Sequence, residues 1–255
     1  MSAVLDRILA DKRLRLERGE YSAKAPAKAG SDGARFVASL REPGVRIVAE
    51  FKARSPSAGE ILVGADGKVE TFALAYRRGH AAAISVVAEQ DHFGGSPEWV
   101  TRAKRISGLP VLLKDFLLSE AQLDFAVSLG ADAVLLVVRA LRENELADLR
   151  RGAAERGLAV VVEAHGREEI PRAAAVEPDV LGVNARDLGT FETNLAGLEP
   201  LAAEIPAGPV RLAESGVSSR DDVSRLSAAG WEAFLVGETL LRADDPEQKL
   251  RELVR

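Results

Sequence analysis

The feature that most constrains the fold is a regular alternation of short apolar runs with helix-like segments, which continues from Arg46 to the C-terminus. The runs are rich in Val, Ile, Leu and Ala, as expected for strands buried on both faces of a parallel sheet. Strict alternation of strand and helix predicts parallel strands joined by helical crossovers. The eight predicted strands are Arg46–Phe51, Ala82–Val87, Val111–Lys114, Ala133–Val138, Ala159–Glu163, Val180–Asn184, Val210–Ala213 and Ala233–Val236.

The segments between and after these strands carry apolar residues at three- and four-residue spacing, which predicts helices. Gly79, Gly108, Gly130, Gly157 and Gly230 lie shortly before the next strand, where a helix end uses a left-handed backbone. The predicted helices are Val69–Arg78, Pro97–Ile106, Glu120–Leu129, Glu143–Arg156, Arg167–Val176, Leu195–Glu204, Arg220–Ala229 and Pro246–Val254.

Eight such units in a chain of 255 residues favour a closed (β/α)8 barrel, the TIM barrel of the α/β class, which typically takes about 250 residues. An open doubly wound sheet is the alternative, but no G-x-G-x-x-G follows the first strand. Pro171 weakens the prediction of one helix, because an interior proline removes a hydrogen bond. We expect residues 1–255 to form a single barrel domain.

Residues 1–45 precede the repeating pattern. Residues 1–20 have roughly the spacing of an amphipathic helix, Ser22–Gly33 reads as a linker, and Ala34–Leu40 predicts a second short helix. The extension is therefore expected to be largely helical.

Composition excludes several classes of function. The chain has 34 basic and 39 acidic residues, a net charge of −5 and no long basic block, so a nucleic-acid partner is not expected. No apolar run approaches the roughly 20 residues of a membrane span, and the N-terminus lacks a secretory pattern, so we expect a cytoplasmic protein without a membrane partner. There is no cysteine, and the three histidines lack metal-ligand spacing, so no metal site is predicted.

Ionisable residues close several of the predicted strands. In a (β/α)8 barrel the carboxyl ends of the strands carry the chemistry, and the two-residue strand period places Glu50 and Lys52 on one face. Lys114, Glu163 and Glu214 end other strands, so coupled carboxylates and ammonium groups are predicted in one mouth. Such a group favours proton-transfer chemistry, although each charge could instead end a strand and face water. The same strand-end reasoning adds Phe116, Asn184 and Arg186.

Small residues in the loops add two weaker predictions. Glycines after the seventh and eighth strands, in Glu214-Ser215-Gly216 and Val236-Gly237-Glu238, suggest a phosphate site, although tight turns alone would also explain them. Arg54–Gly59 could be a movable lid or an ordinary surface loop. His165 is interpreted as a residue at the rim of the mouth, with a proton shuttle as the alternative.

The motifs resemble those of the indole-3-glycerol phosphate synthases, (β/α)8 lyases of tryptophan biosynthesis. Ile47–Gly59, which reads Ile-Val-Ala-Glu-Phe-Lys-Ala-Arg-Ser-Pro-Ser-Ala-Gly, is similar to the first-strand signature of this family, and further segments agree in order and spacing across almost the whole chain. These segments are Ile84–Val86, Phe93–Ser96, Leu113–Phe116, Gly130–Leu136, Val162–His165, Gly182–Leu188, Ala213–Val217 and Ala233–Glu238.

The resemblance implies ring closure, decarboxylation and dehydration of 1-(2-carboxyphenylamino)-1-deoxyribulose 5-phosphate to indole-3-glycerol phosphate, without a cofactor or metal. It implies that Lys114 is the general acid of ring closure and Glu163 the proton-transfer partner in dehydration. Lys52 would bind the substrate and is a second candidate proton donor. Glu50 and Asn184 would complete the catalytic network.

The resemblance also implies the residues that bind the substrate. Phe116 would line the aryl pocket, while Ser55 and Arg186 would hold the anthranilate end. Other implied substrate-binding residues belong to the polar network or to the phosphate side. They are Glu214, Ser215, Gly216, Leu235, Gly237 and Glu238. The family also implies that residues 1–45 form a helical cap over the carboxyl-end face of the barrel. A phosphorylated small molecule is the expected partner, and we expect a monomer.

Two other functions remain open at this stage. Another sugar-phosphate barrel is possible, such as an isomerase of aminated ribulose phosphates or an aldolase that uses Lys114 as a Schiff base. A barrel that binds phosphate without catalysis is the second alternative.

Overall fold

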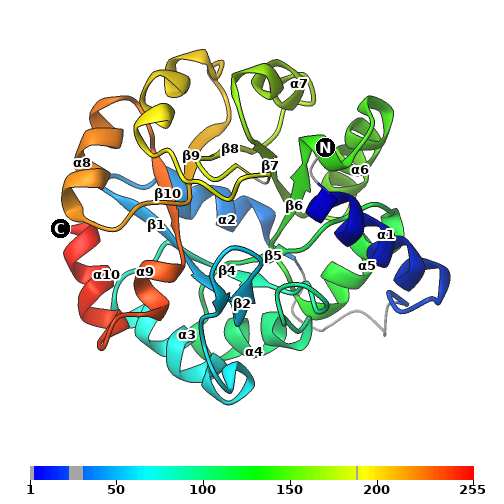
Figure 1. Ribbon diagram of the computed structural model, residues 1–255, viewed down its shortest axis with the longest axis horizontal. Helices are drawn as coiled ribbons and strands as arrows, with labels where there is room; N and C mark the ends of the chain where they lie inside the picture. Colours follow the sequence, from blue (N-terminus) through cyan, green and yellow to red (C-terminus); the bar gives the residue numbers. More distant parts are fainter. Residues whose placement is uncertain (1–2, 23–30, 188) are drawn as a thin grey trace.

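The computed structural model describes residues 3–22, 31–187 and 189–255, and eight parallel strands close into a barrel. Around the barrel the strands follow the order β1, β10, β9, β8, β7, β6, β5 and β4, which returns to β1. Figure 1 shows the helices arranged around this central ring. The prediction of a (β/α)8 barrel is therefore confirmed. Its strands are β1 (Arg46–Phe51), β4 (Ala83–Val87), β5 (Val111–Lys114), β6 (Ala133–Val137), β7 (Ala159–Ala164), β8 (Val180–Asn184), β9 (Val210–Glu214) and β10 (Ala233–Val236).

The helices also agree with the sequence pattern, with three departures. The short helix Glu238–Leu241 after the last strand was not predicted. Pro171 lies in the first turn of a short helix rather than in the interior of a long one, so it removes no helical hydrogen bond. The segment with Pro200 forms a 3₁₀ helix, Ala196–Glu204, instead of an α-helix. The barrel helices are α3 (Val69–Arg78), α4 (Glu98–Ser107), α5 (Glu120–Leu129), α6 (Glu143–Glu155), α7 (Ile170–Ala174), α8 (Arg220–Ala228), α9 (Glu238–Leu241) and α10 (Pro246–Val254).

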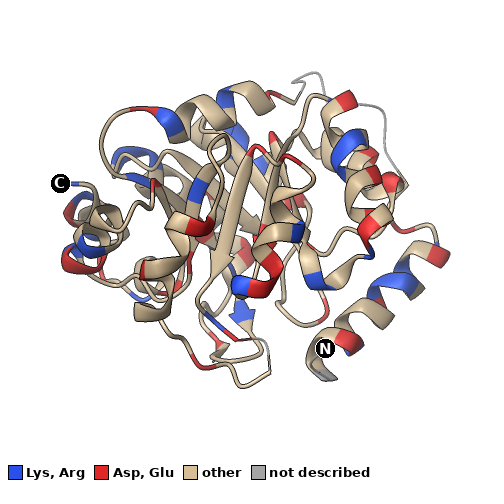
Figure 2. Cartoon of the chain, turned by 90° about the horizontal axis from the view of Figure 1, so that it is seen from above, with Lys and Arg blue, Asp and Glu red and all other residues tan. Residues whose placement is uncertain are grey.

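The strands are buried on both faces, which explains their nearly continuous apolar sequences. One face of each strand fills the barrel interior, where Val48, Leu112 and Leu212 are fully buried. The other face packs against the surrounding helices, as Ile47 and Leu136 do. Most of each strand ribbon is accordingly uncharged in Figure 2, where Lys, Arg, Asp and Glu gather on helices and loops.

One predicted glycine conformation is wrong. Gly79 ends α3 with a φ of −76°, and the following His80 takes the left-handed backbone at +68° instead. Gly79 is required for another reason, since a Cβ there would lie 2.9 Å from the Leu250 side chain on α10. Close packing of two helices, rather than a turn, therefore fixes this glycine.

The second helix of the N-terminal extension, α2 (Gly33–Arg41), closes the amino end of the barrel. Its Phe36 and Leu40 are buried in the interior cluster with the first residues of several strands, including Ala133 and Ala233. The Gly33 N–H donates to the carbonyl of Gly157, just before β7, at 2.9 Å. A Cβ on Gly33 would approach the Ala159 nitrogen to 2.3 Å, so α2 sits directly against the strand end.

The first helix, α1 (Ala3–Glu17), lies at the opposite end. Its Val4, Leu5 and Ile8 line the cavity at the carboxyl ends of the strands, and Figure 1 shows it over one side of the barrel, near α5 and α6. The structure thus differs from the prediction that the whole extension, residues 1–45, covers the carboxyl-end face. The apolar face of α2 fills the amino-end opening instead. The linker predicted within Ser22–Gly33 falls mainly on residues 23–30, outside the described part of the chain.

The loop after β1 is a small hairpin, which sequence analysis did not anticipate. Its strands β2 (Arg54–Ser55) and β3 (Gly59–Glu60) pair antiparallel, and Gly59 supplies the left-handed turn with a φ of +66°. Among residues 3–22, 31–187 and 189–255, no helix has the length and apolar character needed to cross a membrane.

Candidate active site

Four strands bring charged side chains to one point at the carboxyl end of the barrel. The ammonium of Lys114, which ends β5, lies 2.7 Å from the Glu214 carboxylate at the end of β9. It lies 3.5 Å from Glu50 on β1 and 3.5 Å from Glu163 on β7. The prediction that these residues meet is confirmed by this geometry. We call Lys114 and the three glutamates the charged cluster.

Because the charged cluster is buried, the pKa of each of its groups depends strongly on the charges of the others. Glu50 and Glu163 are each 4% exposed and Glu214 is fully buried, so each carboxylate depends on neighbouring groups rather than on water. Burial opposes the charge of Lys114, but the three carboxylates outweigh it and raise the pKa of its ammonium. Lys114 therefore holds its proton at neutral pH.

The carboxylates of Glu163 and Glu214 have opposite protonation tendencies. Burial, followed by the charge of Glu163, raises the pKa of Glu214 to about 8, although Lys114 opposes this shift. Burial also acts against ionisation of Glu163, but Lys114 and then His165 hold the pKa of that carboxyl well below its usual range. Two neighbouring carboxyls with separated pKa values provide one proton acceptor and one proton donor at neutral pH.

A glycine makes room for this carboxyl pair. Gly182 on β8 is in register with Glu163 on β7, and a Cβ on Gly182 would come within 2.2 Å of the Glu214 carboxylate. Any larger residue would displace Glu214 from the cluster. The sequence signal was present, because Gly182 occupies an inward strand position where bulky aliphatic residues are more common.

His165 does not lie at the exposed rim, which corrects the interpretation from sequence. Its side chain is fully buried, with Nε2 3.0 Å from the Glu163 carboxylate and Nδ1 3.9 Å from Glu169. Neither ring nitrogen has the alignment of a hydrogen bond. The strand β7 ends at Ala164, so His165 is the first residue after the strand.

The second predicted lysine belongs to the same mouth. Lys52 follows β1 and donates a hydrogen bond of 2.7 Å to Glu50, which therefore links both lysines. Asn184, at the end of β8, accepts a 3.0 Å hydrogen bond from the backbone N–H of Arg186. The guanidinium of Arg186 donates to Ser57 Oγ at 3.1 Å, and Ser57 Oγ lies 3.2 Å from Ser55 Oγ.

The charged cluster forms the floor of a cavity of about 420 Å³, a size suited to a small phosphorylated molecule. Every predicted site residue except Glu214 lines this cavity, and Glu214 contacts it through Lys114. The lining residues from the prediction are Glu50, Lys52, Ser55, Lys114, Phe116, Glu163, Asn184, Arg186, Ser215, Gly216, Leu235, Gly237 and Glu238.

The two ends of the cavity differ chemically. One side holds Phe93 and Phe116, whose ring centroids are 6.5 Å apart, together with Leu5 and Ile8 of α1. This apolar wall suits an aromatic ring.

The other side holds the turns after β9 and β10. Ser215 and Gly216 have left-handed backbones, with φ values of +68° and +86°. A Cβ on Gly237 would lie 2.5 Å from the Glu50 carboxylate, so only glycine fits there.

Several residues of the cavity were not predicted from the sequence. Phe93, Ser57 and Asp115 belong to recognised motifs but were assigned no role, and Glu89 in the lining was missed altogether. Lys12, which does not line the cavity but contacts Asp115 behind it, was also missed. Lys12 had one available signal, because it continues the apolar spacing of Leu5, Ile8 and Leu9 on α1. Within the part of the chain that the structure describes, no group of His, Cys, Asp or Glu is arranged to hold a metal ion.

Comparison with protein families gives a match over almost the whole chain. The family model described as indole-3-glycerol phosphate synthase matches residues 5–253. A curated protein of that name from Koribacter versatilis is 41% identical over 261 residues, and the alignment covers 100% of both chains. Indole-3-glycerol phosphate synthase 2 from Streptomyces coelicolor is 39% identical over 259 residues, again with 100% of both chains covered.

Solved structures share the fold at low sequence identity. Orotidine 5'-phosphate decarboxylase from Pyrococcus horikoshii superposes with a TM-score of 0.63 at 14% identity and covers 82% of this chain and 97% of its own. The 3-hexulose-6-phosphate synthase from Salmonella typhimurium gives a TM-score of 0.61 at 16% identity, covering 82% of this chain and 96% of its own. At such identities the likeness extends to the barrel alone.

Proposed function

The chain belongs to the indole-3-glycerol phosphate synthase family, whose members are carboxy-lyases of tryptophan biosynthesis, and we propose that its charged cluster carries out the proton transfers of that reaction. The observation that carries the proposal is the position of the Lys114 ammonium within 3.5 Å of three buried carboxylates. The substrate is 1-(2-carboxyphenylamino)-1-deoxyribulose 5-phosphate, and the product is indole-3-glycerol phosphate.

Lys114 is the general acid of ring closure. The aryl carbon that carries the carboxylate attacks the ribulose carbonyl, and the electron pair of the carbonyl moves onto its oxygen. The ammonium of Lys114 donates a proton to that oxygen, since the raised pKa keeps it protonated before the reaction. Loss of carbon dioxide then restores the aromatic ring. A positioned acid of this kind contributes about 10²- to 10⁴-fold to the rate.

Glu163 is the proton-transfer partner in dehydration. Its lowered pKa keeps it ionised, so it can accept the proton that is removed as the new hydroxyl leaves. The leaving hydroxyl needs a proton. Lys52 supplies it, or Lys114 does so after a proton from water has restored its ammonium, since Glu50 holds both side chains in the mouth. Asn184, which is in register with Glu214, completes the network.

Two further groups hold the substrate by its ends. The anthranilate carboxylate binds near Arg186 and Ser55, with the ring against Phe116, and the phosphate binds at the turns that contain Ser215 and Gly237. The opposite chemistry of the two ends of the cavity supports this orientation. Binding at both ends folds the flexible substrate so that its reacting carbons meet. Leu235 and Glu238 line the phosphate side.

The protein acts as a cytoplasmic monomer on this one phosphorylated small molecule and needs no cofactor, metal, nucleic acid or membrane. We also propose that the hairpin β2–β3, whose Ser55 and Ser57 line the cavity, closes over the mouth during turnover. Incubation with synthetic substrate and detection of indole fluorescence tests the function. Absence of product, with the substrate bound but unchanged, would support a phosphate-binding barrel instead. Borohydride trapping of a substrate adduct on Lys114 would support an aldolase.

A further inference from the structure

The first helix carries a buried lysine that the reaction described above does not use. Lys12 is 1% exposed, on the same face of α1 as the buried Leu5, Ile8 and Leu9. Moving an ammonium out of water costs several kcal/mol unless it is paired, and an aliphatic residue would dock this face at lower cost. The lysine therefore serves something other than the attachment of α1.

Lys12 contacts two buried carboxylates that organise the aryl side of the cavity, and its ammonium also lies 5.6 Å from the centre of the Tyr21 ring. Its Nζ lies 2.7 Å from Asp115 Oδ1 and 3.8 Å from Glu89 Oε1. Asp115 is 6% exposed and Glu89 is 2% exposed, so water does little to offset their charges. Both carboxylates therefore share the Lys12 ammonium. Burial acts to lower its pKa, but the charge of Asp115 outweighs burial and raises the pKa to about 12.

Each carboxylate fixes the backbone of one aromatic residue. Asp115 Oδ1, the oxygen that contacts Lys12, also accepts a 2.7 Å hydrogen bond from the backbone N–H of Phe116. Glu89 Oε2 accepts hydrogen bonds from the backbone N–H groups of His92 and Phe93, at 2.7 and 3.0 Å. One ammonium on α1 is therefore linked through two carboxylates to the two rings of the aryl wall.

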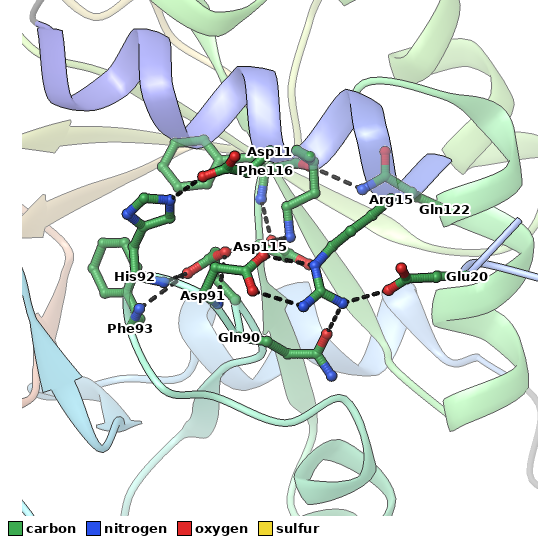
Figure 3. Close-up of polar contacts among 12 residues, drawn as sticks. Asp11, Arg15, Glu20, Gln90, Asp91, His92, Phe93, Asp115, Phe116 and Gln122 are labelled. Atoms are coloured by element: carbon green, nitrogen blue, oxygen red, sulfur yellow. Dashed lines mark hydrogen bonds and ion pairs between the residues drawn. The ribbon is translucent and has the colours of Figure 1, made fainter. Parts of the chain in front are cut away.

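Outer contacts hold α1 to the same segment. Figure 3 shows Arg15 directed toward Asp91 and Glu20, and His92 toward Asp11. The guanidinium of Arg15 makes two parallel contacts with Asp91, at 2.6 and 2.7 Å. These contacts are partly exposed and explain attachment of the helix, whereas Lys12 is buried on the cavity side.

We propose that Lys12 is a positioning residue for the aryl end of the substrate, acting through Asp115 and Glu89 on Phe116 and Phe93. The inference rests on the proposed function, because it takes the Phe93–Phe116 wall as the anthranilate site. Without Lys12, two buried carboxylates lose their shared counter-charge. Each carboxylate must then take up a proton or move toward water. Either change weakens the acceptor that holds the backbone N–H of Phe116 or Phe93, so the rings lose their fixed positions.

The test compares Lys12→Met with the wild type in turnover and in binding of two separate probes, anthranilate and inorganic phosphate. We expect KM and the anthranilate Kd to rise about tenfold, with kcat within about twofold and phosphate binding unchanged. The matched control is Arg13→Met, which also replaces a basic residue of α1 by methionine but at the neighbouring exposed position, and it should alter none of these constants. Equal weakening of both probes, or no change in either, would overturn the proposal.

Two further variants extend the test. One distinguishes positioning of the rings from a general loosening of α1, and the other keeps the test valid if Lys12→Met folds poorly. Leu9→Ala weakens the docking of α1 without changing charge, and a selective loss of anthranilate binding in that variant would contradict the proposal. The double variant Lys12→Met/Asp115→Asn restores the net charge that this cluster has in the wild type and should fold. Its anthranilate Kd should stay within about threefold of the single variant's, whereas multiplying effects would exclude action through Asp115.

These binding measurements stay informative if the proposed function fails. A wild type that binds anthranilate and phosphate but forms no indole product would refute the reaction alone. A wild type that does not bind anthranilate would refute the inference as well.

Discussion

The two helices of the N-terminal extension attach to opposite ends of the barrel by opposite chemistry. α2 closes the amino end with buried apolar side chains, Phe36 and Leu40, and backbone contacts. α1 lies at the carboxyl end and adds a buried ammonium and a partly exposed guanidinium to an apolar stripe. The difference shows how this barrel separates its tasks, with stability at one end and substrate chemistry at the other.

The largest effect on activity is expected from a substitution at the carboxyl end of the barrel. Lys114→Ala should lower kcat/KM for indole product by at least about 10³-fold, because the reaction loses its acid. The matched control is Lys104→Ala at the amino end, where Lys104 pairs with Asp132 at 2.7 Å. That variant should keep kcat/KM and lose only stability. Product fluorescence and urea denaturation distinguish the two, and normal turnover by Lys114→Ala would refute its role.

Truncating a buried side chain at the amino end should lower stability and leave activity unchanged. Phe36→Ala should lower the free energy of unfolding by about 3–5 kcal/mol, because it leaves a cavity under the barrel. KM and kcat at 25 °C should be unchanged in the folded fraction. Urea denaturation gives the stability and initial rates give the activity. A selective rise in KM would show that the two ends are not independent.

Glu163→Gln should affect one step of the reaction. Ring closure depends on Lys114, so it should continue, while dehydration should slow by about 10²-fold without the proton acceptor. A cyclised, decarboxylated intermediate should then accumulate, which rapid quenching and mass spectrometry can detect. An unchanged product profile would count against this role.

The smallest effect is a pH dependence of stability set by Glu214. Its folded-state pKa of about 8 is raised from an ordinary value of 4.5, so between these values the folded protein binds more protons than the unfolded chain. The free energy of unfolding contributed by Glu214 should therefore fall as pH rises from 5 to 9. Glu163 acts in a different window, because its lowered pKa adds stability that is lost below about pH 4.5.

The control for this pH effect is Glu214→Gln, in which the decline should be weaker. Urea denaturation of both proteins across that pH range measures the difference. Parallel curves for the two proteins would exclude Glu214 as the source.

Much of this site was predictable because the strand period is fixed. Glu50 and Lys52 had to share a face, and the carboxyl ends of parallel strands had to meet at one end of a closed barrel. The boundaries of β1, β5 and β8 agree with the sequence pattern for the same reason. The hairpin β2–β3 was missed because its strands are too short to show a period.

The placement of the extension could not be predicted from local pattern. An apolar stripe such as that of α2 predicts that one face of the helix is buried. It does not indicate which end of the barrel that face packs against. The same limit applies to His165, whose position depends on where the chain turns after β7.

The sequence by itself determined the barrel, its parallel strands and the residues that meet at its mouth, because these follow from local periodicity and from closure of the sheet. Tertiary structure alone decided which carboxyl of the charged cluster keeps its proton, that α2 lies at the amino end, and that Lys12 reaches Asp115. Those properties depend on burial and on distances between segments far apart in the chain, and neither quantity is encoded in the spacing of residues.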